Sequence, residues 1–508
     1  MTTSEKPGGK VSRRDFFKIG AVAGAGLQVA GIAGAGYVAG KTTESYTAWR
    51  DFSGAKQTDR KAWEIDKPPH RKVGATRRPN KDTEYIFKRN MLFGKALKDG
   101  WKPDQGVEKL GEPLASFYKR HPDDLKNDIE RYFKIFPKRA RDTKKYKNYF
   151  ALANAYSAGW GDIFTSYPPE PDKPPEESDY EMVKYGGTGR PNVVKKIGEP
   201  MPFKSKDHAS KLIKKIAHLY GATVVGIAKL NPDWVWDRDV RGGKPGPFQV
   251  PKHWEYAIVV GVPHEWDQVL SNPAHGTSYD GYNRARNCSG RLTAFIKGLG
   301  YPARSHHPPA MYDLILPPVT VDAGVGELGR HGFVITPETG ANIRTACVTT
   351  NLPMTVDKPI EFGVKHFCRT CKICAELCPS GSISMADSEK GMVLRGYEHW
   401  FIDTSSCINY WFKAMGPLGC RLCLACCPYS RKGNYAHKLS QIVDRNDPTG
   451  LAASALTWMQ KLMFKAPGAQ EYLPPPDGRF ASYREAPAWL KTEEWFDVPI
   501  RKPKKGDA

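Results

Sequence analysis

The cysteines of this 508-residue chain concentrate between positions 368 and 428. A first run has the spacing Cys-x2-Cys-x2-Cys-x3-Cys-Pro and consists of Cys368, Cys371, Cys374 and Cys378. A second run repeats the last three places of that spacing with Cys420, Cys423 and Cys427. In proteins with the full spacing, three cysteines hold one [4Fe–4S] cluster and the fourth reaches across to a second cluster. The second run lacks its first ligand, and Cys407 is the best upstream candidate.

The cross-over of the fourth cysteine divides the expected ligands into two sets. One cluster is expected on Cys368, Cys371, Cys374 and Cys427, and the other on Cys378, Cys407, Cys420 and Cys423. We interpret Cys426 as a bystander, because the motif needs only a spacer there, although the choice between Cys407 and Cys426 stays open. Zinc sites or disulfides are the alternative, but zinc favours two separated Cys-x2-Cys pairs. The sequence therefore predicts two [4Fe–4S] clusters.

The composition is that of a basic globular protein. The formal net charge is +22, which favours anionic surfaces or acidic partners. The sequence carries no zinc finger, RNA-binding signature or recognition-helix pattern, so a solvated basic surface is favoured over nucleic-acid binding. Cys288, Cys347 and Cys426 are expected to be small buried hydrophobes. The number of thiolate ligands indicates that the clusters are inserted in a reducing compartment.

The first 40 residues have the pattern of an export signal. Ser-Arg-Arg-Asp-Phe-Phe-Lys at 12–18 is a twin-arginine signal, and a weakly hydrophobic stretch rich in Gly and Ala follows at 19–39. A membrane helix is the alternative, but this composition would make it a poor anchor. The twin-arginine route carries folded proteins, which suits a protein that takes up clusters before export. Membrane attachment is expected to come from a partner, because no later segment is apolar enough to span a bilayer.

The chain is expected to divide into five segments. These are a signal peptide at 1–40, an irregular N-terminal wrapping region at 41–200, a core at 201–355, a two-cluster domain at 356–435 and a C-terminal tail packed on the body at 436–508. Short helices are predicted in the wrapping region at 123–135 and 145–157. The tail is expected to begin with a helix at about 449–464.

The core segment alternates between helical and strand patterns. Apolar residues at helical spacing stop at Gly221, residues 223–230 and 256–262 have the pattern of buried strands, and 282–299 fits a second helix. This alternation favours an α/β core with both sheet faces covered. The glycines between 322 and 344 would allow the backbone to approach a large planar or anionic ligand. A glycine-rich loop without a ligand is an equally good interpretation on local sequence.

Four of these features occur together: the twin-arginine signal, the alternating core, a segment that ends Thr-Pro-Glu-x-Gly-x-x-x-Arg, and paired cysteine motifs with a displaced first ligand. The combination resembles the respiratory reductive dehalogenases from residue 1 to about 430, most strongly at 12–18, 322–354 and 361–428. The resemblance implies an α+β fold, in which a nitroreductase-like α/β core holds a base-off corrinoid of the cobalamin type beside a ferredoxin-like domain with two [4Fe–4S] clusters. The Asp-x-His-x-x-Gly motif that supplies a lower histidine ligand in other corrinoid proteins is missing from that family and from this sequence.

The resemblance also implies site residues. It assigns the catalytic tyrosine to Tyr282 and its basic partner to Arg344, although local sequence alone favours a buried helix tyrosine and an ordinary ion pair. A third position, Asn in some members, falls near His306 or His307, and we assign it to His307 as a candidate catalytic residue. The residues expected along the corrinoid are Thr336, Pro337, Glu338, Gly340, Asn342, Tyr410 and Trp411.

The implied reaction removes halide from a small organohalide with two electrons and one proton, as the terminal step of organohalide respiration. Electrons from an upstream donor would pass through both clusters and reduce the cobalt to Co(I). Tyr282 would give the proton, and Arg344 would favour this step by stabilising the phenolate. The implied location is the outer face of the cytoplasmic membrane, with a small integral membrane anchor protein as partner.

Two other functions compete with this one. An exported ferredoxin-like electron carrier would hold iron and sulfide but no cobalt, and it would leave the region from 280 to 344 unexplained. A corrinoid iron–sulfur reductase similar to the epoxyqueuosine reductases would share the core and the cysteine motifs. Those enzymes act on tRNA in the cytoplasm, so the export signal counts against this second alternative.

Overall fold

The computed structural model describes residues 57–70, 79–145, 200–241, 244–247, 250–251, 253–264, 275–308, 312–415, 420–430 and 435–463. The signal peptide, most of the helix predicted at 145–157 and the tail beyond 463 lie outside these residues.

A four-stranded sheet forms the centre of the fold. Its strands, in spatial order, are β1 (Val224–Lys229), β4 (Tyr256–Val262), β8 (Arg344–Thr350) and β5 (Ala303–His306), and all neighbouring strands pair antiparallel. The strands predicted at 223–230 and 256–262 are therefore confirmed. Every residue of β4 is buried, and only the last residue of β1 is exposed. Burial on both faces explains why these strands have continuous apolar sequences instead of alternating ones.

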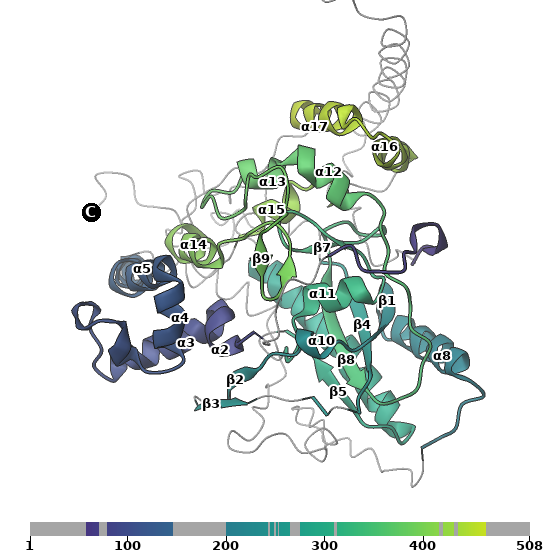
Figure 1. Cartoon of the computed structure of the whole chain (residues 1–508), viewed down its shortest axis with the longest axis horizontal. Coiled ribbons are helices and arrows are strands. Elements are labelled where there is room, and N and C mark those ends of the chain that lie inside the picture. The colour runs from purple at the N-terminus through teal and green to yellow at the C-terminus, as the bar shows by residue number, and fades with distance from the viewer. Residues whose placement is uncertain are drawn as a thin grey trace, which may run out of the picture.

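Helices cover both faces of the sheet (Figure 1). Val225 and Ile227 point to the face covered by α8 (Lys206–Leu219) and α10 (His275–Gly298). Their neighbours on β1 point to the opposite face, where α11 (Leu316–Asp322) and three buried tryptophans pack. Alternate residues of a strand point to opposite faces, so one strand contributes to two cores. The predicted sheet with two covered faces is confirmed.

The two long helices of the core follow the predicted apolar spacing. The side chain of Ser205 caps α8 by accepting a hydrogen bond from the backbone N–H of His208, and Gly221 follows the helix with a φ of 102°. The helix predicted at 282–299 is confirmed as α10, with Leu292 and Ile296 fully buried against the sheet. It begins earlier than predicted, at His275. This early start places Tyr282 inside the helix instead of at its first turn.

One glycine sets how closely α11 approaches the sheet. A Cβ atom on Gly226 would lie 2.0 Å from the carbonyl oxygen of Ala323, the residue that directly follows α11. Only a residue without a side chain allows this approach. The glycine in the middle of β1 is therefore a packing requirement.

Helices with their own small core build the described part of the N-terminal region. They are α2 (Lys81–Glu84), α3 (Ile86–Lys98), α4 (Leu114–Arg120), α5 (Pro122–Glu130), a π-helical turn (Arg131–Ile135) and α6 (Phe136–Lys145). We call residues 81–145 the N-terminal helical unit. Buried apolar side chains, including Phe93, Phe117 and Tyr118, form its core. The short helix predicted at 123–135 is confirmed by α5 and the π-helical turn that follows it. The layer is more regular than expected, because Pro122 begins a helix instead of interrupting one.

The cysteine-rich part packs beside the sheet and consists of short helices. These are α12 (Val364–Cys371), α13 (Ile373–Glu376), α14 (Thr404–Tyr410) and α15 (Leu422–Ala425), with a hairpin of β9 (Val393–Leu394) and β10 (Tyr397–Glu398). Two further helices follow, α16 (Tyr435–Arg445) and α17 (Leu451–Met463), and α17 packs on α12. The helix predicted at about 449–464 is confirmed as α17.

The remaining described elements are short. The strands are β2 (Arg238–Arg241), β3 (Lys244–Pro247), β6 (Glu327–Leu328) and β7 (Val334–Ile335). The 3-10 turns are Lys61–Trp63, Pro103–Gln105, Val107–Leu110, Pro232–Trp234 and Pro428–Ser430, and a second π-helical turn, Trp411–Met415, continues α14.

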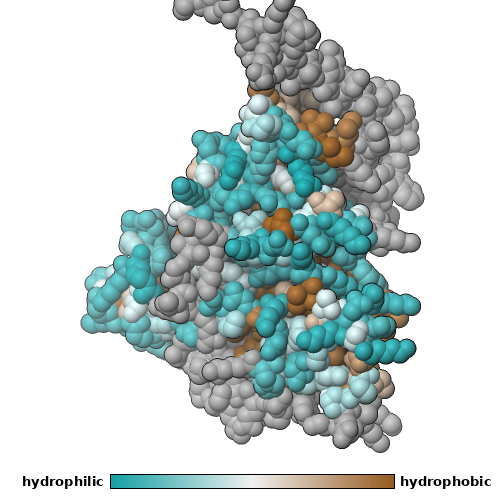
Figure 2. All heavy atoms as spheres, turned by 45° about the vertical axis from the view of Figure 1, so that its right-hand side comes forward, coloured by the Kyte–Doolittle hydropathy of each residue, from teal (hydrophilic) through white to brown (hydrophobic). Residues whose placement is uncertain are grey.

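The face of the molecule in Figure 2 is largely hydrophilic, and its hydrophobic residues gather in separated patches. The exposed apolar side chains of α16 and α17 are Ile442, Leu451, Trp458 and Leu462. Among the helices that the structure describes, none is both long enough and apolar enough to cross a membrane.

A buried carboxyl group joins the core to the cysteine-rich part and predicts a pH effect on stability. Glu327 is 1% exposed and accepts hydrogen bonds from the backbone N–H groups of Phe362 and Val364. Burial raises the pKa of Glu327 from 4.5 to about 7, which corresponds to roughly 3 kcal/mol. The folded state holds this proton more tightly than the unfolded state, so its contribution to stability is lost as pH rises from about 4.5 to about 7.

Replacing Glu327 with glutamine should therefore raise the melting temperature relative to the parent protein more at pH 8 than at pH 5. Thermal unfolding at both pH values measures the difference. Glu255→Gln, which removes a half-exposed carboxylate, is the control and should show no such difference. An effect of Glu327→Gln that is equal at the two pH values would contradict the prediction.

Candidate active site

The first predicted set of cysteines lines one cavity. Cys368, Cys371, Cys374 and Cys427 line the same pocket. A left-handed residue, Lys372, separates α12, which carries the first two, from α13, which carries Cys374. This break turns the chain around the cavity. The buried guanidinium of Arg330 donates two hydrogen bonds, of 3.0 and 2.7 Å, to the carbonyl oxygen of Cys368 and so fixes the wall of the cavity.

The thiols of the second predicted set of cysteines also lie near one another. Burial, and then the neighbouring thiols Cys420 and Cys378, raises the pKa of Cys407 to about 12. Burial, Cys420 and Cys407 likewise raise the pKa of Cys423 well above its ordinary value. These mutual effects require the four sulfur atoms to lie near one another. The structure therefore brings together Cys378, Cys407, Cys420 and Cys423, although Cys407 comes from the separate helix α14.

Cys426 faces the other set. It is 1% exposed, and its Sγ atom lies 3.7 Å from the carbonyl oxygen of Cys423. After burial, Cys426 is the largest influence that raises the pKa of Cys374, which belongs to the first set. Cys426 therefore lies beside the first set, and Cys407 is the fourth thiol of the second set. Ligation by any of these residues stays a prediction.

The donor sets fit iron–sulfur clusters chemically. No three His, Cys, Asp or Glu side chains of the described residues gather closely enough to hold a single metal ion. A [4Fe–4S] cluster instead takes one thiolate at each of four irons, spread around a cavity. Burial raises the pKa of Cys371 to about 11, so its thiolate needs a nearby cation. Metal ions supply that charge and deprotonate a coordinating thiol outright.

Tyr282 and Arg344 meet at the edge of the core. Tyr282 lies on α10, and Arg344 is the first residue of β8. The guanidinium carbon of Arg344 lies 4.7 Å from the centre of the Tyr282 ring, a cation–π contact. A Cβ atom on Gly281 would lie 2.7 Å from His264 and 3.2 Å from Arg344, so this glycine lets α10 approach the strand. The structure brings together the two residues that the resemblance selected.

Two further residues, neither of them predicted from the sequence, join this pair. The side chain of Tyr312 interacts with Arg344, and burial raises the pKa of Tyr312 well above its ordinary value. Arg421 is buried and lies over the ring of Trp411, with 5.0 Å between its guanidinium carbon and the ring centre. Burial, and then the nearby charge of Arg344, lowers the pKa of Arg421. Its position within the second cysteine motif was the available signal.

Arg421 connects the catalytic candidates to the second set of cysteines. It follows Cys420 directly, and its Nη1 atom donates a 2.6 Å hydrogen bond to the carbonyl oxygen of that residue. Its charge also acts on Cys407 and Cys423, whose pKa values it lowers against the larger effect of burial. One buried guanidinium therefore faces both the thiols and the Tyr282–Arg344 pair.

The two candidate histidines are neutral and differ in their surroundings. His306 is fully buried in β5, where its Nε2 atom lies 2.7 Å from the hydroxyl of Thr349 and its Nδ1 atom 3.2 Å from Asp313. Burial lowers the pKa of His307 to about 4, and its Nδ1 atom lies 2.9 Å from the carbonyl oxygen of Pro308. His307 therefore carries no charge near neutral pH and is unsuited to act there as an imidazolium acid. A catalytic role for His307 stays a prediction.

The glycine-rich segment is used mainly for contacts within the protein. A Cβ atom on Gly324 would lie 2.2 Å from the carbonyl oxygen of Lys358, and one on Gly340 would lie 1.9 Å from that of Tyr429. Both glycines also have positive φ, of 64° and 60°. The close approaches that these glycines allow are thus to neighbouring chain segments. This favours the interpretation of the segment as a loop packed on the protein.

The residues expected along the corrinoid fall into two groups. Glu338 is paired with Arg60 at 2.6 Å, and the hydroxyl of Thr336 bonds that of Thr339 at 2.9 Å, so protein partners already engage both side chains. Pro337 is half-buried between them. Asn342 differs, because its Nδ2 atom donates to the carbonyl oxygen of His264 while its buried Oδ1 atom has no hydrogen-bond partner among the described residues.

Tyr410 and Trp411 lie where α14 passes into the π-helical turn. Trp411 is half-buried and contacts Arg421, as described above, so it lies near the Tyr282–Arg344 pair. Asn342, Tyr410 and Trp411 are therefore the expected residues that still fit a bound group. The buried Nε atom of Arg344 also lacks a hydrogen-bond partner among the described residues.

Comparison with known proteins identifies a matching family model and several similar chains. A family model described as a 4Fe–4S dicluster domain matches residues 367–430. The tetrachloroethene reductive dehalogenase of Desulfitobacterium hafniense is 29% identical over 341 residues, which cover 57% of this chain and 61% of the relative. That of Sulfurospirillum multivorans is 30% identical over 259 residues, 44% of this chain and 51% of the relative. The chain thus spans about three fifths or less of these relatives.

A solved structure shows the same fold. It is a catabolic reductive dehalogenase in complex with 3-bromo-4-hydroxybenzoic acid, with a TM-score of 0.53 and 23% identity. The match covers 83% of this chain and 51% of the other. The predicted α+β fold, the dicluster domain and the resemblance to this family are therefore confirmed.

Proposed function

We propose that this chain, with the sequence features and fold of the reductive dehalogenases, removes halide from a small organohalide using two electrons and one proton. The observation that carries the proposal is the contact of Arg344 with the Tyr282 ring, joined through Arg421 to a converging set of four cysteines. A proton donor and an electron route thus meet at one place. Reductive cleavage of a carbon–halogen bond needs both.

Tyr282 is proposed to donate the proton from its Oη atom. The guanidinium of Arg344 contacts the ring, and its positive charge favours the phenolate that remains after donation. Tyr312 lies against Arg344 and, because burial raises its own pKa, stays a neutral phenol. Tyr312 therefore positions the pair, whereas Tyr282 gives the proton.

A corrinoid of the cobalamin type is proposed as the resident cofactor, on the strength of the family resemblance and of the unpartnered Oδ1 atom of Asn342. When bound, it supplies the low-potential cobalt at which the carbon–halogen bond is reduced. Asn342, Tyr410 and Trp411 would hold it. Thr336, Glu338 and Gly340 do not fit as direct contacts, because other protein groups occupy them. A base-off form is proposed because the sequence lacks the motif for a lower histidine ligand.

The two sets of cysteines are proposed to hold one [4Fe–4S] cluster each. The second cluster is then next to Arg421, and a fixed positive charge at that place favours electron uptake by the cluster. Electrons from an upstream donor would therefore enter at the first cluster and leave through the second. Nucleic acid is not proposed as a partner.

We further propose a role as the terminal reductase of organohalide respiration. The twin-arginine pattern at 12–18 supports export to the outer face of the cytoplasmic membrane, with a small integral membrane protein as the anchor. Two substrate classes follow from similar proteins, since two relatives are named for tetrachloroethene and one structure holds a brominated hydroxybenzoate. A substrate screen should include both classes.

Metal content is the first test of this function. Protein matured with corrinoid under anaerobic conditions should contain about one cobalt and about eight iron per chain. Elemental analysis with a visible spectrum measures both. Eight iron without cobalt, after loading under several conditions, would contradict the dehalogenase and favour the electron carrier.

A further inference from the structure

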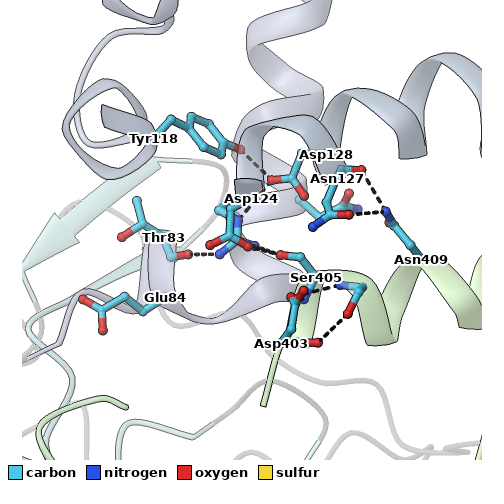
Figure 3. A network of polar contacts seen from close by, with 12 residues as sticks. Thr83, Glu84, Tyr118, Asp124, Asn127, Asp128, Asp403, Ser405 and Asn409 are labelled. Atoms are coloured by element: carbon cyan, nitrogen blue, oxygen red, sulfur yellow. Dashed lines mark hydrogen bonds and ion pairs between the residues drawn. The ribbon is translucent and has the colours of Figure 1, made fainter. Parts of the chain in front are cut away.

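The helix that carries Cys407 is held from outside the cysteine-rich part. Only seven residues long, α14 contacts α3 and α5 of the N-terminal helical unit (Figure 1). Figure 3 shows the polar network between them, which reaches from Tyr118 and Asp128 on one side to Ser405 and Asn409 on the other. The two sides are about 280 to 320 residues apart in sequence, as for Arg89 and Ser405, which are 316 apart.

The centre of the network is a buried carboxylate between two arginines. Asp128 is fully buried, and it accepts from Arg89 Nε at 3.0 Å and from Tyr118 Oη at 2.6 Å. Arg131 Nη1 lies 2.7 Å from the other carboxylate oxygen. Fully buried charges keep such positions only when their partners are fixed. Both guanidinium groups are thereby oriented for their remaining contacts.

Those remaining contacts reach α14. Arg131 Nε donates to the Oδ1 atom of Asn409 at 2.8 Å, and Asn409 Nδ2 donates to the carbonyl oxygen of Asn127 at 3.0 Å. Arg89 Nη2 donates to the hydroxyl of Ser405, which donates to Asp124. Each end of the short helix is therefore fixed to the N-terminal helical unit.

The helix geometry makes these contacts act on Cys407. Ser405 and Asn409 are four residues apart and share one face of α14. Cys407 is two residues from each and points about 200° away around the helix. One face is thus held by the arginine network while the other presents the thiol to Cys420 and Cys378. Asp403 fixes the start of the helix by accepting from the N–H groups of Ser405 and Ser406.

We infer that the N-terminal helical unit is part of the second cluster's site, with Ser405 and Asn409 as positioning residues for the ligand Cys407. The inference rests on the proposed clusters but not on the proposed substrate or corrinoid. It explains how a ligand displaced far upstream of its motif is delivered: an ordinary motif places its first cysteine by a local turn, whereas here a distant unit of the chain does so.

The test compares iron content and electron paramagnetic resonance spectra of the reduced full-length protein. The double variant Ser405→Ala/Asn409→Ala removes the contacts of α14 but leaves the Arg89–Asp128–Arg131 ion pairs intact. We expect it to lose about half of its iron, from about eight to about four per chain, with the signal of the second cluster missing and that of the first retained. Its spectrum should match that of Cys407→Ser.

Two matched variants separate positioning from general damage. Tyr118→Phe removes a hydrogen bond to the same Asp128 without touching α14, and it should keep all of its iron. Ser405→Thr keeps the hydroxyl and should behave like the parent protein. Full iron and an unchanged spectrum in the double variant would overturn the inference, and so would equal loss from both clusters. Because turnover is never measured, failure of the dehalogenase function leaves this result unaffected.

Discussion

Replacing Tyr282 with phenylalanine should lower turnover of an organohalide by about 10²–10⁴-fold, the usual range for losing a positioned proton donor. The variant keeps the ring that contacts Arg344 and loses only the hydroxyl group. Iron and cobalt content should therefore stay at the level of the parent protein. Steady-state rates with a low-potential chemical donor, measured beside metal analysis, give both quantities.

The matched control for this prediction is Tyr312→Phe. Tyr312 interacts with the same arginine and is half-buried like Tyr282, but in the proposed mechanism it only orients Arg344. Its loss should reduce turnover much less than the loss of the Tyr282 hydroxyl. If Tyr282→Phe has near-normal activity, or if Tyr312→Phe is the more damaged variant, Tyr282 is not the proton donor.

The central sheet could be predicted from sequence because its signals are local. The apolar run at 256–262 coincides with β4, and the spacing that ends at Gly221 gave the helix α8. The antiparallel order of the four strands was not predictable in this way, because it depends on which strands pair across the fold. Of the N-terminal helical unit, only the helix at 123–135 was predicted, for a related reason. Its charged residues look like a solvated surface in sequence, yet Arg89 and Arg131 are buried by partners far along the chain.

The candidate site also contains residues that could be predicted from sequence and residues that could not. Seven of the eight cysteines were predictable because cluster motifs have fixed short spacings, and Cys407 because the second motif lacks its first place. Tyr282 and Arg344 were predictable because the family resemblance marks their positions. Tyr312 lies in no motif, and Arg421 lies in the second cysteine motif only as a spacer residue, so only the fold brings them to Arg344. The glycines of the segment at 322–344 suggested a ligand from sequence, whereas close contacts with neighbouring backbone account for Gly324 and Gly340.

Replacing Cys407 with serine should remove the second cluster and lower the iron content from about eight to about four per chain. The serine hydroxyl fits the space, but it does not supply the thiolate that an iron requires. Cys407 is the one member of the second set that lies on a helix outside the motif, next to Cys420 and Cys378. Iron analysis and the spectrum of the reduced protein should therefore show the first cluster alone.

Cys426 provides the matched comparison, because it is also buried and directly precedes a proposed ligand. Its neighbour is Cys374 of the first set, and no place in the second set is left for it once Cys407 is counted. Cys426→Ser and Cys426→Ala should therefore both retain about eight iron. If Cys426→Ser loses a cluster while Cys407→Ser keeps both, the two residues must exchange roles, and the N-terminal helical unit would then hold a helix that carries no ligand.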